Sequence, residues 1–569
     1  MKDLLRLAAL LVLLVPSAAL ADASSEQYRG CDGYGAASDD GDGMTRWASV
    51  LLIFNPPGYG NTERHASTAG DQGIADCNAA LADLPAKHWM RKVSLLRARA
   101  LHRLDDDDTA NALADLDAAD AVAKEHDDPF FTRSLGVGLD ITRAYITRRA
   151  GNQAAAETMA LDAIAERPFS RQVVASALIA MGPKTSEANL TQGIEDIARI
   201  VPTTVDELFL RAFDEEHFDQ AIALYPGLVA PREIGDLNIS ADDLTERQWR
   251  DFRTKELFAT SRAGAYAYAL AATGKAGQAR AALADARAML AADCADPPPL
   301  SDKDAKDSDK VAVYQGTLDI HKRMSGEGGK VLDHWNTLVE ARLSLADGKA
   351  MEVLKAIPGY GLAADGAGAD LIDAVFAALP KKARPKTSPA DTIRAKIAAA
   401  LSQGREPGSD VLVRTLPDAE TADRVPDYSQ ASKPLFASRQ SAADLTMDGY
   451  TSDPPDADGA VAVGFRAEAS TQAMVEECAL LRAAELARAA GKKGMIVTGR
   501  FDTKFETTTT YYGTPLRSDP NGYRTMIEVV FVDPAALPEK FQGAPWRVLD
   551  ADAVYAALAP VYIKAKPAK

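Results

Sequence analysis

A chain of 569 residues is long enough for several domains or one long repeat array, and its 47% hydrophobic content is ordinary for a folded protein. Alanine is abundant and aromatic residues make up only 7%, which favours helices over sheets. The formal net charge of −17 argues against nucleic-acid binding, because an acidic surface repels the phosphate backbone.

Residues 1–21 have the pattern of a secretory signal peptide. A basic start and a short apolar run precede an A-x-A sequence, so we expect signal peptidase to cut between Ala21 and Asp22. The run is too short to span a bilayer comfortably, no later stretch could span one, and no cysteine follows the site to carry a lipid. We therefore expect a mature protein without a transmembrane segment, in the periplasm or secreted. The alternative is that the segment is kept as a membrane anchor.

Export changes how the four cysteines are interpreted, because an oxidising compartment permits disulfides. Of the three possible arrangements of pairs, we favour one with Cys31 joined to Cys77, since these two flank the N-terminal region. The pairing of Cys294 and Cys478 stays open, and Cys478 could be a small core residue. No C-x-x-C spacing supports a zinc site or thioredoxin chemistry.

Residues 22–69 form a loop-rich N-terminal segment. The sequence DDGDG at 39–43 suggests calcium, but Met44 and Thr45 do not fit the EF-hand template, so a solvated loop is expected. The sequence NPPGYGN at 55–61 is interpreted as a turn, because it lacks a phosphate-loop pattern.

The stretch 261–287 predicts two short helices joined by a tight turn at Gly274, since glycine takes the left-handed cap conformation without a Cβ penalty. Each helix has a stripe of small or apolar residues three or four apart, so the helices can bury both stripes by packing antiparallel. The stripes are Ala263, Ala267 and Leu270, and Ala279, Leu283 and Ala286.

This spacing resembles the tetratricopeptide repeat (TPR), a family of helical hairpins with small contact residues, a glycine at the turn and a proline at the end. The matching residues here are Ala267, Gly274 and Ala279; a second copy matches through Ala144, Gly151, Ala156, Ala163 and Pro168; a third, without the glycine, matches through Phe218, Ala221, Ile222 and Tyr225. Residues 95–119 and 341–357 match more weakly. The resemblance implies a solenoid that binds proteins, while a generic helical solenoid remains the alternative.

Catalytic motifs are missing from the sequence. It has no G-x-S-x-G elbow, no G-x-G-x-x-G fingerprint and no H-E-x-x-H pattern, so we predict no catalytic, cofactor-binding or metal-ligating residue. The run Asp105–Asp108 precedes a predicted helix, where carboxylates favour the positive helix end, so we interpret it as a cap rather than a metal site.

Residues 404–458 are polar and rich in proline, and predict a linker. From 459 the order strand, helix, strand, strand predicts a small α+β domain, with the helix over 471–490 and glycine at 491. Thr507–Thr510 could add a partner strand, but an internal strand pair is favoured. Arg482 and Glu485 are interpreted as surface charges rather than an active-site pair.

The C-terminal domain is similar to a domain of small predicted bacterial envelope proteins, often lipoproteins, that have no assigned activity. The matching residues are Phe465, Arg466, Val475, Glu476, Leu480, Leu481, the run Arg482–Leu486, and Gly491. The resemblance implies a bacterial envelope context and no catalytic residue. This chain lacks the lipid-modified cysteine, which puts membrane attachment in doubt.

The expected protein is thus mostly α: TPR-like helical hairpin repeats followed by a small α+β C-terminal domain. We expect an exported envelope protein, not an enzyme, that needs no cofactor and contacts protein partners in the cell envelope. The alternatives are an envelope hydrolase whose site is dispersed in the sequence, or a glycan or small-ligand binder that uses Trp47. The expected division is 1–21 signal peptide, 22–69 N-terminal segment, 70–403 repeat region, 404–458 linker and 459–569 C-terminal domain.

Overall fold

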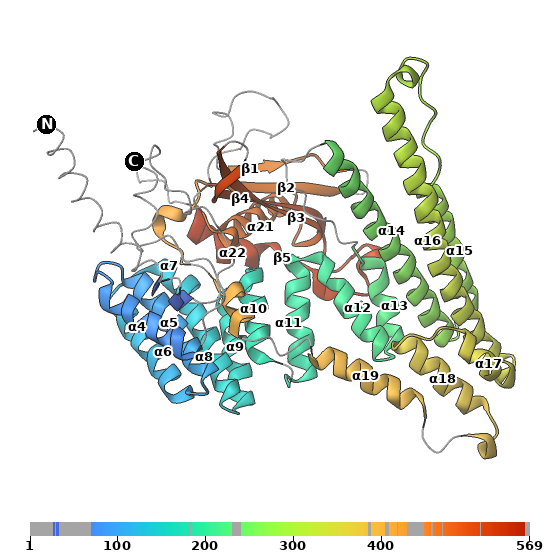
Figure 1. Ribbon diagram of the computed structural model, residues 1–569, viewed down its shortest axis with the longest axis horizontal. Coiled ribbons are helices and arrows are strands. Elements are labelled where there is room, and N and C mark those ends of the chain that lie inside the picture. Colours follow the sequence, from blue (N-terminus) through green and yellow to red (C-terminus); the bar gives the residue numbers. More distant parts are fainter. Residues whose placement is uncertain are drawn as a thin grey trace, which may run out of the picture.

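The chain is described by a computed structural model, which places residues 27–28, 30–32, 70–182, 184–229, 241–384, 388–403, 409–417, 419–428, 449–456, 459–468, 470–511 and 514–563. The predicted signal peptide with its cleavage site at Ala21 and Asp22, the DDGDG segment, Trp47 and the NPPGYGN turn lie outside these residues. The protein is mostly α, and a small α+β unit with an antiparallel sheet ends it, as predicted. Figure 1 shows the sheet lying along one side of a long array of helices.

The first part of the array packs around one apolar core, formed by residues such as Leu101, Leu116, Tyr145 and Val174. Each helix buries one stripe against its neighbours, which is how amphipathic helices are stabilised. The elements are α4 (Gly70–Asp83), α5 (Trp89–Asp105), α6 (Thr109–Lys124), α7 (Pro129–Phe131), the π-helix η1 (Thr132–Gly136), α8 (Val137–Arg149), α9 (Gln153–Glu166) and α10 (Arg171–Met181).

The second part has its own core, in which aromatic rings of Phe213, Tyr268 and Trp335 meet edge to face or tilted. Its elements are α11 (Glu187–Ile200), η2 (Pro202–Thr204), α12 (Val205–Asp214), α13 (Phe218–Leu224), η3 (Tyr225–Gly227), α14 (Ala241–Ala272), α15 (Ala276–Asp293), η4 (Asp304–Lys306), α16 (Ser308–Ala346), α17 (Ala350–Ala356), η5 (Ile357–Gly359), α18 (Gly366–Ala378), η6 (Lys381–Ala383) and α19 (Ala390–Gln403).

The same turn joins the two helices of five hairpins in the described part of the chain. The turn residue has a positive φ at Gly151 (+93°), Gly274 (+80°) and Gly348 (+76°), and also at Asp107 (+58°) and Glu216 (+62°). In every case the next amide donates to the carbonyl five residues earlier, which is the Schellman cap. In the two turns without glycine, Asp107 and Glu216 therefore adopt the left-handed backbone conformation, which is less favourable for a residue with a side chain than for glycine.

The predicted seam between the helices of the 261–287 hairpin is present in the structure. Ala267 of α14 and Ala279 of α15 are fully buried, and the remaining stripe residues of both helices are at most 7% exposed. In the other hairpins Ala144, Ala156 and Ala221 are fully buried as well. The tight contacts follow from alanine, because a larger side chain would hold the helix axes apart.

Part of the segment predicted as a linker lies against the array. Helix α20 (Ser409–Thr415) packs on α10, and Leu412 and Leu416 lie fully or almost fully buried in the core of the first helices. Two leucines four residues apart form one buried helix face. Residues 409–417 and 419–428 thus belong to the packed protein, although their overall composition is polar.

The C-terminal unit is a five-stranded antiparallel sheet in the order β1-β2-β4-β3-β5. Its elements are β1 (Gly449–Ser452), β2 (Ala460–Ala467), α21 (Gln472–Ala489), β3 (Gly494–Tyr511), β4 (Thr514–Val532), β5 (Leu549–Asp550) and α22 (Ala551–Tyr562). One face carries Val463, Phe465, Ile527 and Val529 and packs in one core with α21 and α22. β3 and β4 pair along their length, with Thr507 opposite Asp519, so the predicted internal strand pair is present. No helix among the described residues is long and apolar enough to cross a membrane.

Candidate functional site

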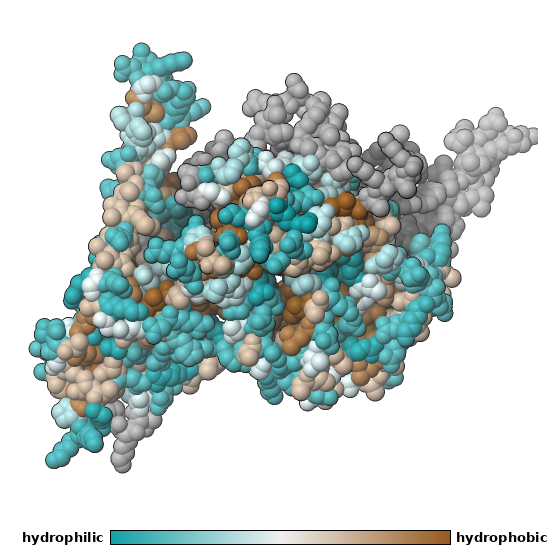
Figure 2. Space-filling view, turned by 180° about the vertical axis from the view of Figure 1, so that it is seen from behind, coloured by the Kyte–Doolittle hydropathy of each residue, from teal (hydrophilic) through white to brown (hydrophobic). Residues whose placement is uncertain are grey.

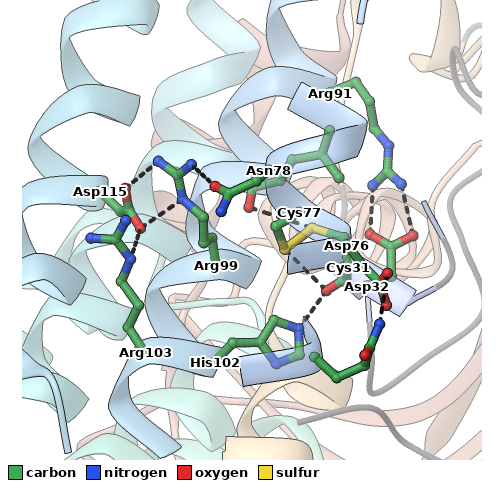
Figure 3. The surroundings of a disulfide bond; sticks show 12 residues. Cys31, Asp32, Asp76, Cys77, Asn78, Arg91, Arg99, His102, Arg103 and Asp115 are labelled. Carbon is green, nitrogen blue, oxygen red and sulfur yellow. Dashed lines mark hydrogen bonds and ion pairs between the residues drawn. A yellow bond between two sulfur atoms is a disulfide. The ribbon is translucent and has the colours of Figure 1, made fainter. Parts of the chain in front are cut away.

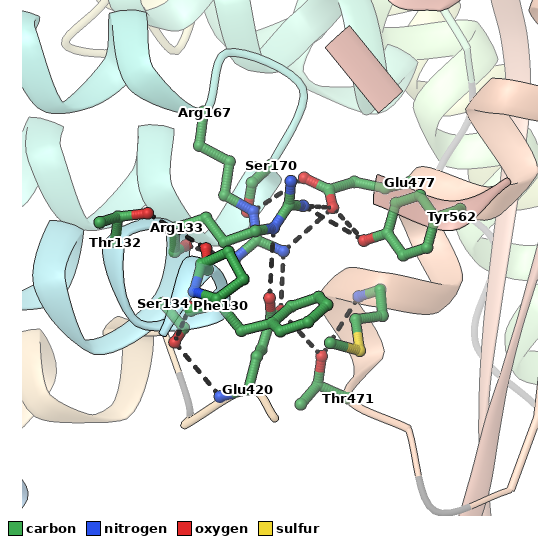
Figure 4. A network of polar contacts seen from close by, with 12 residues as sticks. Phe130, Thr132, Arg133, Ser134, Arg167, Ser170, Glu420, Thr471, Glu477 and Tyr562 are labelled. Carbon is green, nitrogen blue, oxygen red and sulfur yellow. Dashed lines mark hydrogen bonds and ion pairs between the residues drawn. The ribbon is translucent and has the colours of Figure 1, made fainter. Parts of the chain in front are cut away.

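A group of buried charges lies where the helical array meets the C-terminal unit (Figure 4). Its members come from parts of the sequence far apart: Arg133 from η1, Arg167 from the end of α9, Glu420 from the segment after α20, Glu477 from α21 and Tyr562 from the end of α22. We call these five residues the charged joint. Glu420, Glu477 and Tyr562 are each about 1% exposed or less.

Arg167 is the centre of the charged joint. Its Nε donates to Oε1 of Glu477 at 2.8 Å, its Nη2 donates to Oε1 of Glu420 at 2.8 Å, and its Nη1 donates to the carbonyl oxygen of Arg133 at 2.7 Å. Arg133 donates to Glu477, and so does the hydroxyl of Tyr562. All five residues are therefore held in one network that crosses from the array to the C-terminal unit.

The charges in the charged joint balance. Burial would raise the pKa of Glu477, but the two arginines outweigh burial and hold the pKa of this carboxyl below its usual range. Burial and the adjacent Glu477 raise the pKa of Tyr562 well above its ordinary value, so its hydroxyl keeps its proton and donates it in a hydrogen bond. Two cations and two anions then share one buried volume, which is the condition under which buried charge is tolerated.

A second charged group adjoins the first through Glu476, the residue before Glu477 on α21. Arg171 donates to Glu476 at 2.8 Å, and Glu476 also pairs with Arg500 of β3 at 2.6 Å. Arg500 in turn pairs with Asp502 at 2.8 Å, and the hydroxyl of Thr525 donates to the same carboxylate at 2.8 Å. Burial would raise the pKa of Asp502, but Arg500 outweighs burial and lowers it. Again two arginines face two carboxylates.

Arg547 makes a third contact between the helical array and the C-terminal unit, and it bonds to backbone carbonyls rather than to a carboxylate. Arg547 is 1% exposed and donates to the carbonyl oxygens of Gly227 in the array at 2.8 Å and of Val497 in the sheet at 2.9 Å. Burial lowers the pKa of Arg547 to about 10. A single side chain thus bridges η3 and β3.

Local structure explains how these residues reach one another. The wider turn of the π-helix η1 carries Arg133 and Ser134, and the Ser134 hydroxyl accepts from the backbone amide of Glu420 at 3.2 Å. π-helical turns are rare and often occur at functional positions. The charged joint was not predicted from the sequence. The adjacent glutamates Glu476 and Glu477, within the otherwise mostly apolar buried part of α21, were the signal that could have indicated it.

The N-terminal disulfide is a separate structural site (Figure 3). Cys31 and Cys77 are bonded, as predicted, and both are fully buried. Arg91 of α5 donates to both carboxylate oxygens of Asp32 at 2.7 Å, and a ring nitrogen of His102 lies 2.7 Å from the carbonyl oxygen of Cys31. These contacts attach Cys31 and Asp32 to α4 and α5.

The remaining predicted positions lie apart from the charged joint. Cys294 and Cys478 are not disulfide-bonded, and Cys478 is fully buried. Arg482 and Glu485 pair at 2.9 Å at the partly exposed edge of α21. Asp108 caps α6, since its carboxylate accepts from the amide of Asn111, in line with the predicted capping role.

The chemistry open to the charged joint is limited by its packing. A general acid or base must come within hydrogen-bond reach of a substrate, whereas the two glutamates here are buried and engaged by arginines. Such residues can hold two parts of a protein together. Over the described part of the chain, no group of three or more His, Cys, Asp or Glu residues could hold a metal ion.

Comparison with protein-family models, with curated proteins and with solved structures gives no match for this chain. The resemblances to the TPR family and to the envelope domain therefore stay predictions.

Proposed function

We propose that this protein is an exported, non-enzymatic protein–protein interaction scaffold of the bacterial envelope, in which TPR-like hairpins carry the C-terminal unit as a fixed part. The Cys31–Cys77 disulfide supports an oxidising compartment such as the periplasm, since disulfides persist there and are rare in the cytosol.

The observation that carries the proposal is a helical arm that projects from the packed body of the protein. The arm consists of the C-terminal end of α15, η4 and the N-terminal half of α16, and Figure 1 shows it projecting well beyond the body. Helix α16 has 39 residues, so it is about 60 Å long at 1.5 Å per residue. A long projecting helical surface offers contact area to a partner without disturbing the core.

The outer surface of the arm has apolar positions among polar ones. Met289 is 58% exposed and Val313 is 61% exposed. Figure 2 shows the arm from behind, where separate hydrophobic patches lie within a hydrophilic surface. This pattern is typical of a transient protein–protein interface, since obligate interfaces are more hydrophobic.

Site-specific photo-crosslinking in the envelope fraction tests the proposal. A photoreactive residue is placed at Val313, and a matched control is placed at Lys124, which is exposed at the far end of the array. We expect one discrete protein adduct from position 313 and none from position 124. Absence of an adduct from the arm, or equal labelling at both positions, would contradict the scaffold function. Neither alternative from the sequence, the hydrolase or the glycan binder, is favoured by a specific observation among the described residues.

A further inference from the structure

Helix α16 has two sections that differ in packing. All of its buried residues lie between Met324 and Ala341, and none lies in residues 308–323. The neighbouring helix α15 ends at Asp293, one turn after Leu290, which faces Gly328 of α16. The packed bundle therefore stops near Gly328, and α16 continues about 30 Å further toward the tip of the arm (Figure 1).

Three glycines lie in α16 at this boundary: Gly326, Gly328 and Gly329. Glycine destabilises the interior of a helix relative to alanine, and glycine next to serine is a common position for a helix kink. Packing requires only Gly328, because a Cβ atom there would lie 2.9 Å from the side chain of Leu290. At Gly326 and Gly329 a Cβ atom would have no described atom within 4 Å, so close packing does not explain these two glycines.

The layer of helices beside the glycines is incompletely packed. A recess between α14 and α15 is lined by Glu256, Met289 and Leu290, among other residues. Glu256 is 2% exposed, yet its Oε1 lies 3.4 Å from Nζ of Lys255 and has no hydrogen bond within the described part of the chain. A buried polar atom without a hydrogen bond is unfavourable, so this layer is held less tightly than an apolar core layer.

The described polar contacts of the tip hold it together as a unit. A ring nitrogen of His321 lies 2.7 Å from the carbonyl oxygen of Ala295, and the hydroxyl of Tyr314 donates to the carbonyl oxygen of Pro297 at 3.4 Å. Both contacts join α16 to the segment that follows α15, on the same side of the glycines. The ring of Phe252 of α14 stacks on His321 outside the aromatic core of the second part, so this contact can change without opening that core.

We propose that residues 325–329 of α16 form a hinge, about which the tip of the arm, residues 294–324, bends relative to the body. Bending disturbs the helix at the glycines and the surface contact with Phe252, while Leu332 and Trp335 stay packed in the core. It changes the direction in which the exposed Val313 faces, so the arm can adapt to the shape of a partner. The hinge is a property of the protein alone, so it holds whether or not the scaffold function does.

Pulsed electron paramagnetic resonance on the full chain measures the bend. Spin labels are attached to Val313→Cys in the tip and Ala346→Cys at the end of α16, in a Cys294→Ser background that removes the half-buried free thiol. A straight α16 holds these positions about 50 Å apart, and a bend of about 60° at Gly328 shortens the distance to about 43 Å. We expect a broad distance distribution in the wild type that extends below about 45 Å.

The double variant Gly326→Ala/Gly329→Ala should narrow this distribution toward about 50 Å, because alanine fits at both positions and favours the helix. The matched control Gly316→Ala makes the same change nearer the tip, where a Cβ atom likewise meets no described atom, and should leave the distribution as in the wild type.

Three results would overturn the hinge. The first is a single narrow distribution near about 50 Å in the wild type, which means a rigid arm. The second is a distribution that the double alanine variant leaves equally broad. The third is an equal narrowing in Gly316→Ala, because the tip would then be frayed along its length rather than bent at one place.

Discussion

Neutralising Glu477 should destabilise the protein more than any surface change, because its buried carboxylate accepts hydrogen bonds from both arginines of the charged joint and from Tyr562. Glu477 accepts from Arg167 at 2.8 and 3.0 Å and also from Arg133 and Tyr562. In Glu477→Gln the volume is kept, but two buried guanidinium groups then face Glu420 alone. Breaking a buried ion pair from one side typically costs about 3–5 kcal/mol.

Urea unfolding of the full chain measures this loss at pH 7. The control Glu352→Gln changes an exposed glutamate of α17 and should cost less than about 0.5 kcal/mol. A double-mutant cycle with Arg167→Met isolates the interaction free energy between Glu477 and Arg167. The double variant should recover part of the stability that Glu477→Gln loses. Equal stability of Glu477→Gln and Glu352→Gln would refute the role given to the charged joint.

The same carboxylate predicts a pH dependence. The pKa of Glu477 and that of Asp502 lie below their ordinary values in the folded state. Fewer protons are then bound in the folded than in the unfolded protein, so this stability is full above the unfolded pKa of about 4.3 and is lost as pH falls through the folded pKa values. Wild-type stability should decline below about pH 5, and Glu477→Gln should show a shallower decline.

The hairpins and the disulfide give further predictions. Ala279→Leu should cost about 1–3 kcal/mol because residue 279 is fully buried in the seam, whereas the exposed Ala284→Leu should cost less than about 0.5 kcal/mol; thermal unfolding compares them. Gly274→Ala should destabilise because φ is +80°, and Gly277→Ala in the exposed first turn of α15 should stabilise by about 0.4–1 kcal/mol; opposite signs in urea unfolding are the test. Cys31→Ser should lower stability by about 2–4 kcal/mol, and the difference should vanish when both proteins are reduced.

Much of the helical part could be predicted because its rules are local. The seam of Ala267 and Ala279 follows from residue spacing alone, and so does the cap at Gly274. The turns at Asp107 and Glu216 could not be predicted, because a residue with a side chain rarely adopts positive φ. At Glu216 tertiary structure supplies the reason, since its carboxylate accepts from Arg394 at 2.6 and 2.9 Å.

The candidate site could not be predicted from sequence, because its members depend on long-range packing. Arg167 and Glu477 are 310 residues apart, and no spacing rule connects them. The burial of α20 could not be predicted for another reason. Leu412 and Leu416 are only two residues in a polar, proline-rich stretch, so the average composition of this stretch is still that of a linker. Composition reports an average, while burial depends on which residues share a face.

Differential scanning calorimetry of the full chain tests most directly whether the charged joint makes the helical array and the C-terminal unit one body. At neutral pH we expect a single cooperative transition for the wild type, because α21 and α22 cannot unfold without uncovering the charges of Arg133 and Arg167. In Glu477→Gln the transition should fall in temperature and split, as the C-terminal unit loses its attachment. Two separate transitions in the wild type, unchanged in Glu477→Gln, would contradict the account.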